Sequence, residues 1–295
     1  MTIRDLLVQT TDSLRPVSET PWLDALVILE SIVQRDRGDL LARLPDPVET
    51  VLPPRMEARY RSSVADRARG LPVAYITGYR EFRGLSFMVG PGTLVPRPET
   101  ELLVEETVDR IQAIHRAGKE VRYHDCCTGS GCVAIAVVRE CIARGIMIKP
   151  GFSDNDEGTL GWARRNLERL VPENLSWEIL SGCWLEPLGR RVDVISANPP
   201  YLTEGEAEAA LARGWGEPIG ALAGGVDGLA AYRALIPQAW RRLNPGGYLL
   251  LECGAGQAEQ VSALCRETGF TRVTKRRDFA GYDRLVVAGG QVTDG

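Results

Sequence analysis

The sequence predicts an α/β fold in which a mostly parallel sheet carries helices on both faces, preceded by a small helical bundle. Candidate strands and helices alternate after residue 120, which is typical of a parallel sheet. Before residue 80 the apolar residues follow helical spacing, and no strand alternation interrupts them. At 295 residues, the chain is long enough for two domains.

Residues 1–79 are expected to form the helical domain. Helical periodicity covers 21–35 and 55–70, and the proline-rich stretch 44–55 separates these two runs. No residue pattern there has catalytic spacing. We therefore interpret the domain as a substrate-docking domain, with a purely structural cap as the alternative.

Short extended pieces broken by glycine and proline follow, and they predict a hairpin-containing linker over residues 80–97. A helix is expected from about Pro98 through Arg116. The main domain should span residues 98–289, and residues 290–295 resemble a disordered tail.

The alternating elements of the main domain are short and well separated by turn residues. The expected strands are 121–125, 146–154, 175–180, 191–197 and 248–253, with two more near the C-terminus, and the expected helices are 132–141, 157–170, 228–243 and one further helix. Parallel sheets bind ligands beyond the carboxyl ends of their strands. The chemistry should therefore lie in the loops that follow the first four strands.

Composition excludes several classes of protein. The net charge of −4 and the pI near 5.5 argue against a protein that wraps nucleic acid, so no direct nucleic-acid binding is expected. No apolar run approaches the roughly 20 residues that span a bilayer, and the N-terminus has no signal-peptide core. We expect a cytoplasmic protein without membrane contact.

The seven cysteines fit a reducing compartment better than a disulfide framework. Cys126, Cys127 and Cys132 lie close together in the sequence beside His124, but no second cluster with metal-ligand spacing accompanies them. We therefore expect no metal and interpret these cysteines as small buried apolar side chains.

The stretch "DCCTGSG" (125–131) joins the first strand to its helix. Gly129 and Gly131 allow the backbone to approach a ligand, and the helix N-terminus offers amide hydrogens to a phosphate or a carboxylate. The Gly-Lys-Ser/Thr ending of a Walker P-loop is absent. Glycine-rich turns of this kind are common, so the motif alone indicates a nucleotide-like ligand only weakly.

Asp154 ends the second strand, where dinucleotide-type folds place an acid on ribose hydroxyls. The alternative is a helix N-cap, for which Ser153, Asn155 and Asp156 are equally suitable. Trp184 follows the third strand and is predicted either to cover an adenine ring or to belong to the core.

The motif "NPPY" (198–201) directly follows the fourth strand. Asn198 carries an acceptor and a donor, the two prolines fix the loop without offering N–H groups, and Tyr201 supplies a flat face. We predict that Asn198 and the Pro199 carbonyl accept the two hydrogens of a planar amino group, while Tyr201 packs on its plane. A structural Asn-Pro-Pro turn is the alternative.

A glycine-rich loop, a ribose acid and a strand-terminal "NPPY" together resemble class I S-adenosylmethionine-dependent methyltransferases that modify planar amino nitrogens, with a Rossmann-like seven-stranded sheet. The stretches "PVAYITGYREFRGLSF", "LVPRPETELL", "ANPPY" and "GGVDGL" are similar to the peptide chain release factor N5-glutamine methyltransferases, the HemK-like family. The similarity covers nearly the whole chain, and "REF", "PRPETE" and "NPPY" carry most of its specificity.

The resemblance implies a function and a set of site residues. The implied activity is methylation of the glutamine side chain in the Gly-Gly-Gln motif of bacterial class-1 release factors, with S-adenosylmethionine as cofactor. The implied cofactor-binding residues are Cys127, Thr128, Gly129, Ser130, Gly131, Asp154, Trp184 and Asn198; the substrate-binding residues are Asn198, Pro199, Pro200 and Tyr201, with catalytic roles for Asn198, Pro199 and Tyr201.

Two positions depart from the family pattern. The loop of the family reads D-x-G-x-G-x-G, and Cys127 replaces its first glycine. A β-carbon there should crowd the methionine portion of the cofactor or demand a shifted backbone. Cys183 replaces the acid that usually precedes the adenine-side aromatic residue, which removes a hydrogen-bond acceptor worth about 1 kcal/mol. We expect weaker cofactor affinity with the site preserved.

Two other functions are compatible with these motifs. An adenine-N6 methyltransferase acting on nucleic acid would grip the same flat amino group, but it would need base flipping and a basic surface. A non-catalytic binding protein on a methyltransferase scaffold would account for Cys127 and Cys183.

Overall fold

The computed structural model describes residues 1–116, 118, 120–212 and 216–290. The chain divides into two compact units, one of Met1–Tyr79 with Glu208–Glu217 and one of Arg80–Ala207 with Pro218–Gly295. Apart from Gly290, the tail predicted over 290–295 lies outside the described residues.

The N-terminal unit is helical, as expected. Helix α1 begins with a capping box in which Thr2 and Asp5 satisfy each other's backbone N–H groups, and α2 and α4 begin at prolines. The buried Tyr60 donates a hydrogen bond to Thr10 Oγ1 at 3.1 Å, which links α4 to α1 within the core. The elements are α1 (Ile3–Leu14), α2 (Pro21–Val33), α3 (Arg37–Ala42), η1 (Val48–Thr50), α4 (Pro54–Ala68) and α5 (Val73–Thr77).

A hairpin follows, formed by β1 (Tyr79–Phe82) and β2 (Leu85–Met88). Both residues of its turn have positive φ, +52° at Arg83 and +70° at Gly84. Positive φ at both central positions is the conformation of tight hairpin turns whose twist matches that of the strands. The structure therefore has a hairpin near the start of the range 80–97, where the sequence predicts a hairpin-containing linker, and the role of this range as a linker between domains stays a prediction.

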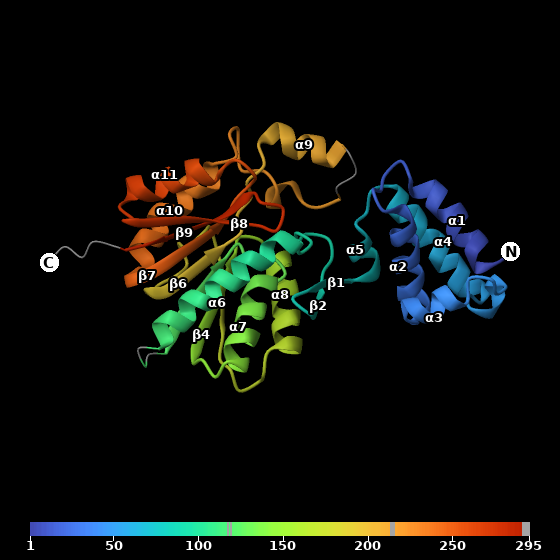
Figure 1. The fold of residues 1–295 in the computed structure, drawn as a ribbon, viewed down its shortest axis with the longest axis horizontal. Helices are drawn as coiled ribbons and strands as arrows, with labels where there is room; N and C mark the ends of the chain where they lie inside the picture. Colours follow the sequence, from blue (N-terminus) through green and yellow to red (C-terminus); the bar gives the residue numbers. More distant parts are fainter. Residues whose placement is uncertain (117, 119, 213–215, 291–295) are drawn as a thin grey trace. The chain divides into compact units, whose positions relative to one another are not determined.

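The main domain holds a seven-stranded sheet in the order β5-β4-β3-β6-β7-β9-β8 (Figure 1). The first five strands of this order are parallel, and β9 pairs antiparallel with both β7 and β8. The chain runs from β3 outward to β5 and then returns to place β6 on the other side of β3. The strands are β3 (Val121–Cys126), β4 (Ile148–Asp154), β5 (Glu178–Ser181), β6 (Val192–Ala197), β7 (Leu243–Glu252), β8 (Arg272–Arg277) and β9 (Asp283–Gly289).

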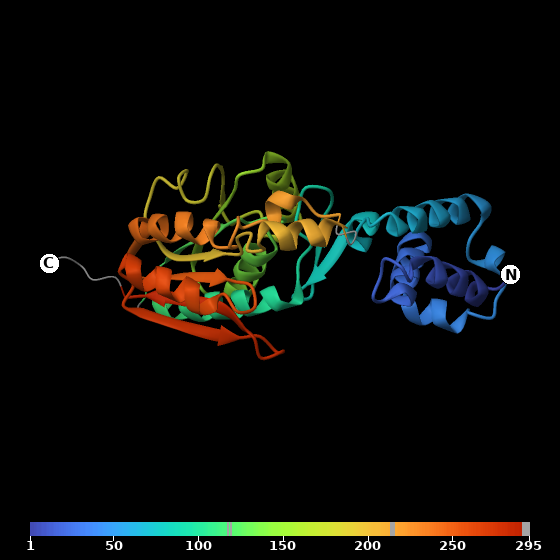
Figure 2. The ribbon, with the colours of Figure 1, turned by 90° about the horizontal axis from the view of Figure 1, so that it is seen from above.

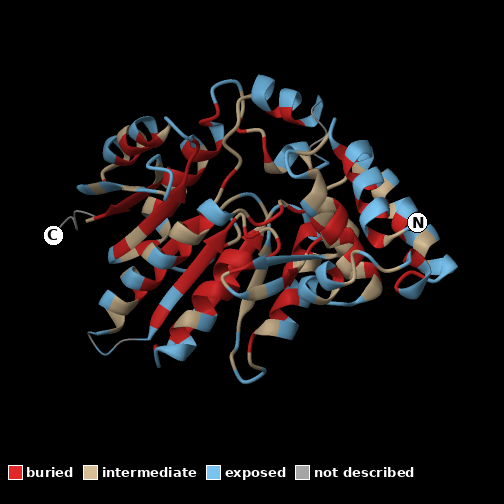
Figure 3. Cartoon of the chain, turned by 45° about the vertical axis from the view of Figure 1, so that its right-hand side comes forward, coloured by how far each residue is buried: buried red, intermediate tan, exposed pale blue. Residues whose placement is uncertain are grey.

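Helices cover the sheet, as the alternation of elements predicts. Figure 1 shows α6, α7 and α8 side by side along the sheet, and Figure 2 shows the same elements from above. In Figure 3 the central strands are buried, whereas the helices turn exposed residues outward. The remaining elements are η2 (Pro98–Thr100), α6 (Glu101–His115), α7 (Cys132–Ala143), α8 (Glu157–Leu170), α9 (Glu204–Ala212), η3 (Ile219–Ala221), α10 (Ala230–Arg242) and α11 (Ala258–Thr268).

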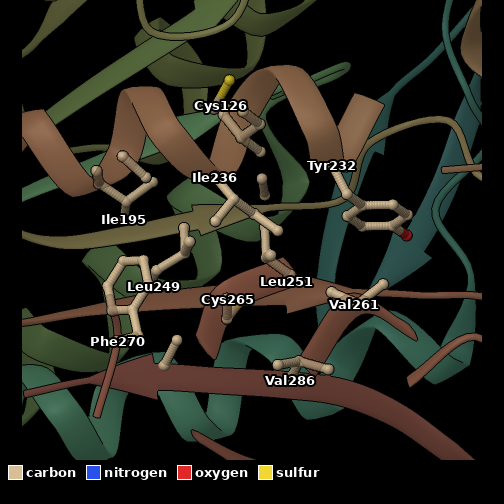
Figure 4. Close-up of a cluster of buried hydrophobic side chains, with 14 of the residues drawn as sticks. Cys126, Ile195, Tyr232, Ile236, Leu249, Leu251, Val261, Cys265, Phe270 and Val286 are labelled. Carbon is tan, nitrogen blue, oxygen red and sulfur yellow. The ribbon is translucent and has the colours of Figure 1, made fainter. Parts of the chain in front are cut away.

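One hydrophobic cluster joins α10 and α11 to the sheet (Figure 4). Ile195 of β6 and Leu249 and Leu251 of β7 point into it, and all three are fully buried. The ring of Phe270 meets that of Trp240 edge to face, with 4.9 Å between the centroids. This packing holds β6 and β7 firmly, and both strands end at the candidate site described below.

None of the helices in the described part of the chain has the length and apolar character that crossing a bilayer requires.

Candidate functional site

A cavity of about 400 Å³ opens at the carboxyl edge of the sheet, where β3 and β6 lie side by side. The connections leave these two strands in opposite directions, which makes this the switch point at which open α/β sheets bind ligands. The predicted residues that line the cavity are Cys127, Thr128, Gly129, Ser130, Asp154, Trp184, Asn198 and Pro200. Gly131, Pro199 and Tyr201 stand outside this lining.

The loop from β3 to α7 has left-handed backbone at three positions, with φ of +59° at Cys127, +58° at Gly129 and +81° at Gly131. The first of these is a cysteine, so the chain keeps a glycine-type conformation without glycine. A β-carbon on Gly131 would lie 3.1 Å from Ile135 Cδ1, because α7 begins directly after this residue. The left-handed backbone explains why glycine suits positions 127 and 129 of the "DCCTGSG" loop, and the close packing against Ile135 explains the glycine at 131.

Asp125 fixes the glycine loop through hydrogen bonds of its buried side chain. Its carboxylate accepts hydrogen bonds from Thr128 Oγ1 at 2.8 Å and from Ser196 Oγ at 2.5 Å, and Tyr123 shares a further bond of 2.7 Å with Ser196. Burial raises the pKa of Asp125 to about 7, although both hydroxyl bonds oppose this shift. These hydrogen bonds join β3 to β6. They therefore connect the glycine loop, which follows β3, to the strand that leads to Asn198.

Asp154 ends β4 and turns its carboxylate toward the glycine loop. Oδ2 accepts the Gly129 N–H at 2.9 Å, and Oδ1 accepts the Asp156 N–H at 3.3 Å. The N-cap of α8 is Asp156, whose side chain accepts from the Thr159 N–H, so the capping alternative for Asp154 does not apply. Burial raises the pKa of Asp154. Its carboxylate retains acceptor sites for hydroxyl groups of a ligand.

Trp184 closes the cavity after β5. The side chain is half-buried. It packs against the hydrophobic cluster and also lines the cavity, so it belongs to the edge of the core and borders the space where a ligand ring would lie. Its backbone is left-handed at φ +53°, and its carbonyl accepts from Ser153 Oγ at 3.3 Å. Ser153 in turn shares a 2.9 Å bond with His124, whose pKa burial lowers to about 3. Cys183 is exposed and lies outside the cavity lining.

Asn198 follows β6 and lines the same cavity as the glycine loop, which follows the neighbouring strand β3. Its Nδ2 donates to Thr100 Oγ1 at 3.3 Å, and Thr100 also lines the cavity. This contact joins the "PRPETE" segment to the "NPPY" segment, although 98 residues separate the two partners.

The stretch 222–229, which includes "GGVDGL", contacts the "NPPY" loop and the residue after it, Leu202, through the backbone. Leu202 N–H donates to Leu222 O at 2.9 Å, and Gly224 N–H donates to Leu202 O at 2.7 Å. A β-carbon on Gly224 would lie 2.6 Å from the Pro200 carbonyl oxygen, and one on Gly228 would collide with the Tyr201 carbonyl oxygen. Only glycine permits this close approach.

Tyr201 is half-buried beside the hydrophobic cluster, and burial together with the nearby Glu252 carboxylate raises its pKa to about 12. Its backbone carbonyl accepts from Gln257 Nε2 at 2.8 Å. The Tyr201 hydroxyl therefore stays protonated at physiological pH, and the residue is held by the packing of its side chain on the cluster and by the bond to its backbone carbonyl.

Two further polar residues at this edge were missed by sequence reasoning. Thr100 lines the cavity, and Glu252 ends β7 with only 4% of its surface exposed. The signal for Glu252 was an acid at the carboxyl end of the apolar run "YLLLEC", directly beside the strand that leads to Asn198. Thr100 carried no such signal, because its partner is distant in the sequence.

Within the described residues no group of three or more histidine, cysteine and acidic side chains is placed to hold a metal ion.

Comparison with known proteins relates the chain to one family over nearly its full length. Residues 5–78 match the family described as the PrmC N-terminal domain. A release factor glutamine methyltransferase of Coxiella burnetii is 34% identical over 98% of this chain and 99% of its own length. The enzymes of the same name from Bordetella pertussis and Cereibacter sphaeroides are 39% and 40% identical, over 93% and 90% of their lengths.

Solved structures show the same fold. A methyltransferase from Pyrococcus furiosus is similar over 81% of this chain and 99% of its own, with a TM-score of 0.52 at 19% identity. The catalytic domain of hMettl16, solved with the MAT2A 3'UTR hairpin 1, gives a TM-score of 0.54 at 16% identity over 81% of each chain. At such identities the similarity shows the fold alone, and the fold is that of class I methyltransferases.

Proposed function

We propose that this chain, which belongs to the release factor glutamine methyltransferase family, methylates the side-chain nitrogen of the glutamine in the Gly-Gly-Gln motif of bacterial class-1 release factors, using S-adenosylmethionine. The observation that carries the proposal is the position of Asn198, which lines the same cavity as the glycine loop in a chain that matches its relatives almost end to end. A methyl donor on the loop and an amino group at Asn198 would then be neighbours.

The residues of the cavity suit S-adenosylmethionine. The volume of about 400 Å³ lies within the roughly 300–1,000 Å³ typical of small-molecule sites. Asp154 has acceptor capacity for ribose hydroxyls, and Trp184 offers a flat face for adenine. The loop residues Thr128–Ser130 and the N-terminus of α7 would hold the methionine portion, whose carboxylate suits free helix amides.

When bound, S-adenosylmethionine would supply an electrophilic methyl group to an incoming nitrogen, with the C–S bond breaking to leave a neutral thioether and one N–H proton of the amide passing to water. The amide nitrogen of glutamine is a weak nucleophile, so the protein must contribute mainly position and charge stabilisation. Asn198 Oδ1 and the Pro199 carbonyl would accept the two N–H groups and stabilise positive charge as it develops on nitrogen. Tyr201 would cover the plane of the amide and limit its rotation.

The departure at Cys127 is compatible with this role. Because the residue keeps a φ of +59°, the loop retains the path that glycine would give it. The neighbouring Cys126 thiol and burial raise the pKa of Cys127, so it presents a neutral thiol at the cavity wall. We propose that the cofactor site is retained, which disfavours a non-catalytic binding protein.

An adenine-N6 methyltransferase remains the second enzyme hypothesis only through the shared "NPPY" motif. The relatives that match this chain are named for release factor glutamine, and the chain carries a net charge of −4. We propose the N-terminal helical unit as a docking surface for the release factor, in keeping with its match to the PrmC N-terminal domain family.

The assignment of roles is tested by the substitution Asn198→Ala. We expect the rate of methyl transfer to a purified release factor to fall by about 100-fold or more, because both position and a charge-stabilising acceptor are lost. Calorimetry should find S-adenosylmethionine still bound by the variant. Undiminished transfer would contradict the role of Asn198, and a wild-type protein that binds no cofactor at millimolar concentration would contradict the enzyme itself.

A further inference from the structure

Glu252 is a buried acid that the proposed reaction leaves unexplained. It is the last residue of β7, which pairs with β6 so that Leu251 stands opposite Ala197. Glu252 is therefore beside Asn198, the residue that follows Ala197. Only 4% of its surface is exposed, and it does not line the cavity.

The surroundings of Glu252 leave its carboxylate short of partners. Oε2 is buried and accepts no hydrogen bond within the described residues. Burial raises the pKa of Glu252 to about 7, while the nearby Thr100 side chain, the charge of Arg284 and the Asn198 side chain oppose the shift. Other titratable or charged groups that face it or feel its charge are Glu99, Cys132, Tyr201, Tyr232, Cys253 and Arg284.

A carboxylate in this position makes a chemical distinction that an apolar residue cannot. The side-chain amide of Asn198 has two faces, an oxygen that accepts and an NH2 group that donates. Above its pKa of about 7 the carboxylate is ionised and only accepts, so it attracts the NH2 group and repels the oxygen. Thr100 Oγ1 accepts the Asn198 Nδ2–H at 3.3 Å. An acceptor on Thr100 and a carboxylate on Glu252 both favour the amide orientation in which Nδ2, and not Oδ1, points toward them.

Stability alone does not account for this acid. A buried carboxylate without a close cation or a full set of hydrogen bonds destabilises the fold, and replacing it by a neutral group of the same shape relieves that penalty. Arg284 acts on Glu252 only through its charge and gives its hydrogen bond to Asp278. A role in orienting the neighbouring Asn198 side chain explains why the protein keeps a buried carboxylate that lowers its stability.

We propose that Glu252 is a positioning residue that, with Thr100, holds the Asn198 amide with Nδ2 toward these two side chains, so that Oδ1 is the atom that Asn198 presents to the substrate nitrogen as an acceptor. This inference rests on the proposed function only for its consequence in catalysis. The orientation of the amide is a property of the free protein.

The first test is therefore spectroscopic and needs no activity. The side-chain NH2 signals of Asn198, assigned by comparison with Asn198→Asp, should shift and exchange faster with water in Glu252→Leu. In Glu252→Gln, which keeps a carbonyl acceptor of the same length, they should stay close to those of the wild type. Signals that are the same in Glu252→Leu and in the wild type would overturn the inference, whatever the protein methylates.

The second test separates positioning from folding. In transfer to the release factor, Glu252→Leu should lower kcat by about 10- to 100-fold, the range expected for a misplaced catalytic group, with S-adenosylmethionine affinity unchanged within about twofold. Glu252→Gln should recover most of this loss. The control Leu250→Val lies on the same face of β7 and is fully buried. It should lower stability and leave kcat unchanged.

The outcomes are distinguishable. A wild-type protein that transfers no methyl group contradicts the proposed function, and the NH2 signals of Asn198 still decide the role of Glu252. An active wild type whose Glu252→Leu variant has the same kcat contradicts the positioning role, and so does a loss that Glu252→Gln leaves unrepaired.

Discussion

Cys127 combines two properties that a side chain rarely tolerates together. It has a φ of +59°, and its thiol lies 3.9 Å from that of Cys126 at the wall of the cavity. Left-handed backbone costs a residue with a β-carbon roughly 1–2 kcal/mol. The sequence identified this position as a departure from the family pattern and left open whether the backbone would shift. In the structure the backbone keeps the glycine-type conformation, so the strain remains local.

The substitution Cys127→Gly should relieve that strain. We expect the free energy of unfolding to rise by about 0.5–1 kcal/mol, because the greater freedom of glycine in the unfolded chain offsets part of the gain. Cofactor affinity should also rise as the side chain leaves the wall. Cys127→Ala is the matched control, since it removes the sulfur and keeps the β-carbon. Urea unfolding and calorimetry measure both effects, and a Cys127→Gly variant less stable than Cys127→Ala would contradict the account.

Secondary-structure elements meet at the site through strand register and through glycine contacts. The sequence predicted the alternation of strands and helices, and the fold is confirmed; it also predicted the ligand roles of the loop residues and of Asn198, which stay predictions. It missed Glu252 and Thr100, because their importance depends on β7 pairing with β6 and on a contact across 98 residues. Local patterns do not encode such pairings.

The close backbone contact between "GGVDGL" and "NPPY" leads to a prediction about the two loops. Gly228 has a φ of +72° and no room for a β-carbon next to the Tyr201 carbonyl oxygen. Gly228→Ala should therefore displace the "NPPY" loop and lower methyl transfer by about 10-fold or more. Gly246→Ala is the control, since Gly246 has a φ of +81° with open space around it. Both substitutions place a β-carbon on a left-handed backbone, so the strain from positive φ should be similar in the two variants. Equal rates of methyl transfer by the two variants would contradict a supporting role for the contact between Gly228 and Tyr201.

The molecule as a whole concentrates perturbed acids at one edge of its sheet. Asp125 and Glu252 are buried there with pKa values raised to about 7, and burial raises the pKa of Asp154, at the end of β4, as well. The N-terminal unit has a separate core built on helices. The stability of the main domain should therefore respond to pH through the same groups that shape the site.

The sign of this response follows from proton uptake. Between their ordinary pKa values and about 7, Asp125 and Glu252 bind protons in the folded protein and release them on unfolding, so both stabilise the fold as pH falls toward about 5. His124, with its pKa lowered to about 3, acts in the opposite direction below about pH 6.5. Stability should therefore rise as pH falls from about 8 to about 6.5.

The variant Glu252→Gln isolates one of these groups. The variant lacks the proton that Glu252 binds in the folded protein and releases on unfolding. The slope of the unfolding free energy against pH should therefore be smaller by up to about 1.4 kcal/mol per pH unit between about pH 5 and pH 7. At about pH 8 the variant should be more stable than the wild type, because it buries no charge. Urea titrations at several pH values measure this, and parallel curves for the two proteins would show that Glu252 ionises as it does in water.

The central claim is that the cavity joins a methyl donor on the glycine loop to a glutamine held at "NPPY". The most direct measurement is transfer of a radiolabelled methyl group from S-adenosylmethionine to a purified class-1 release factor, compared with the same factor carrying alanine in place of the Gly-Gly-Gln glutamine. We predict stoichiometric labelling of the normal factor and none of the alanine form. Equal labelling of both factors, or labelling of neither while adenine-containing nucleic acid is methylated, would contradict the claim.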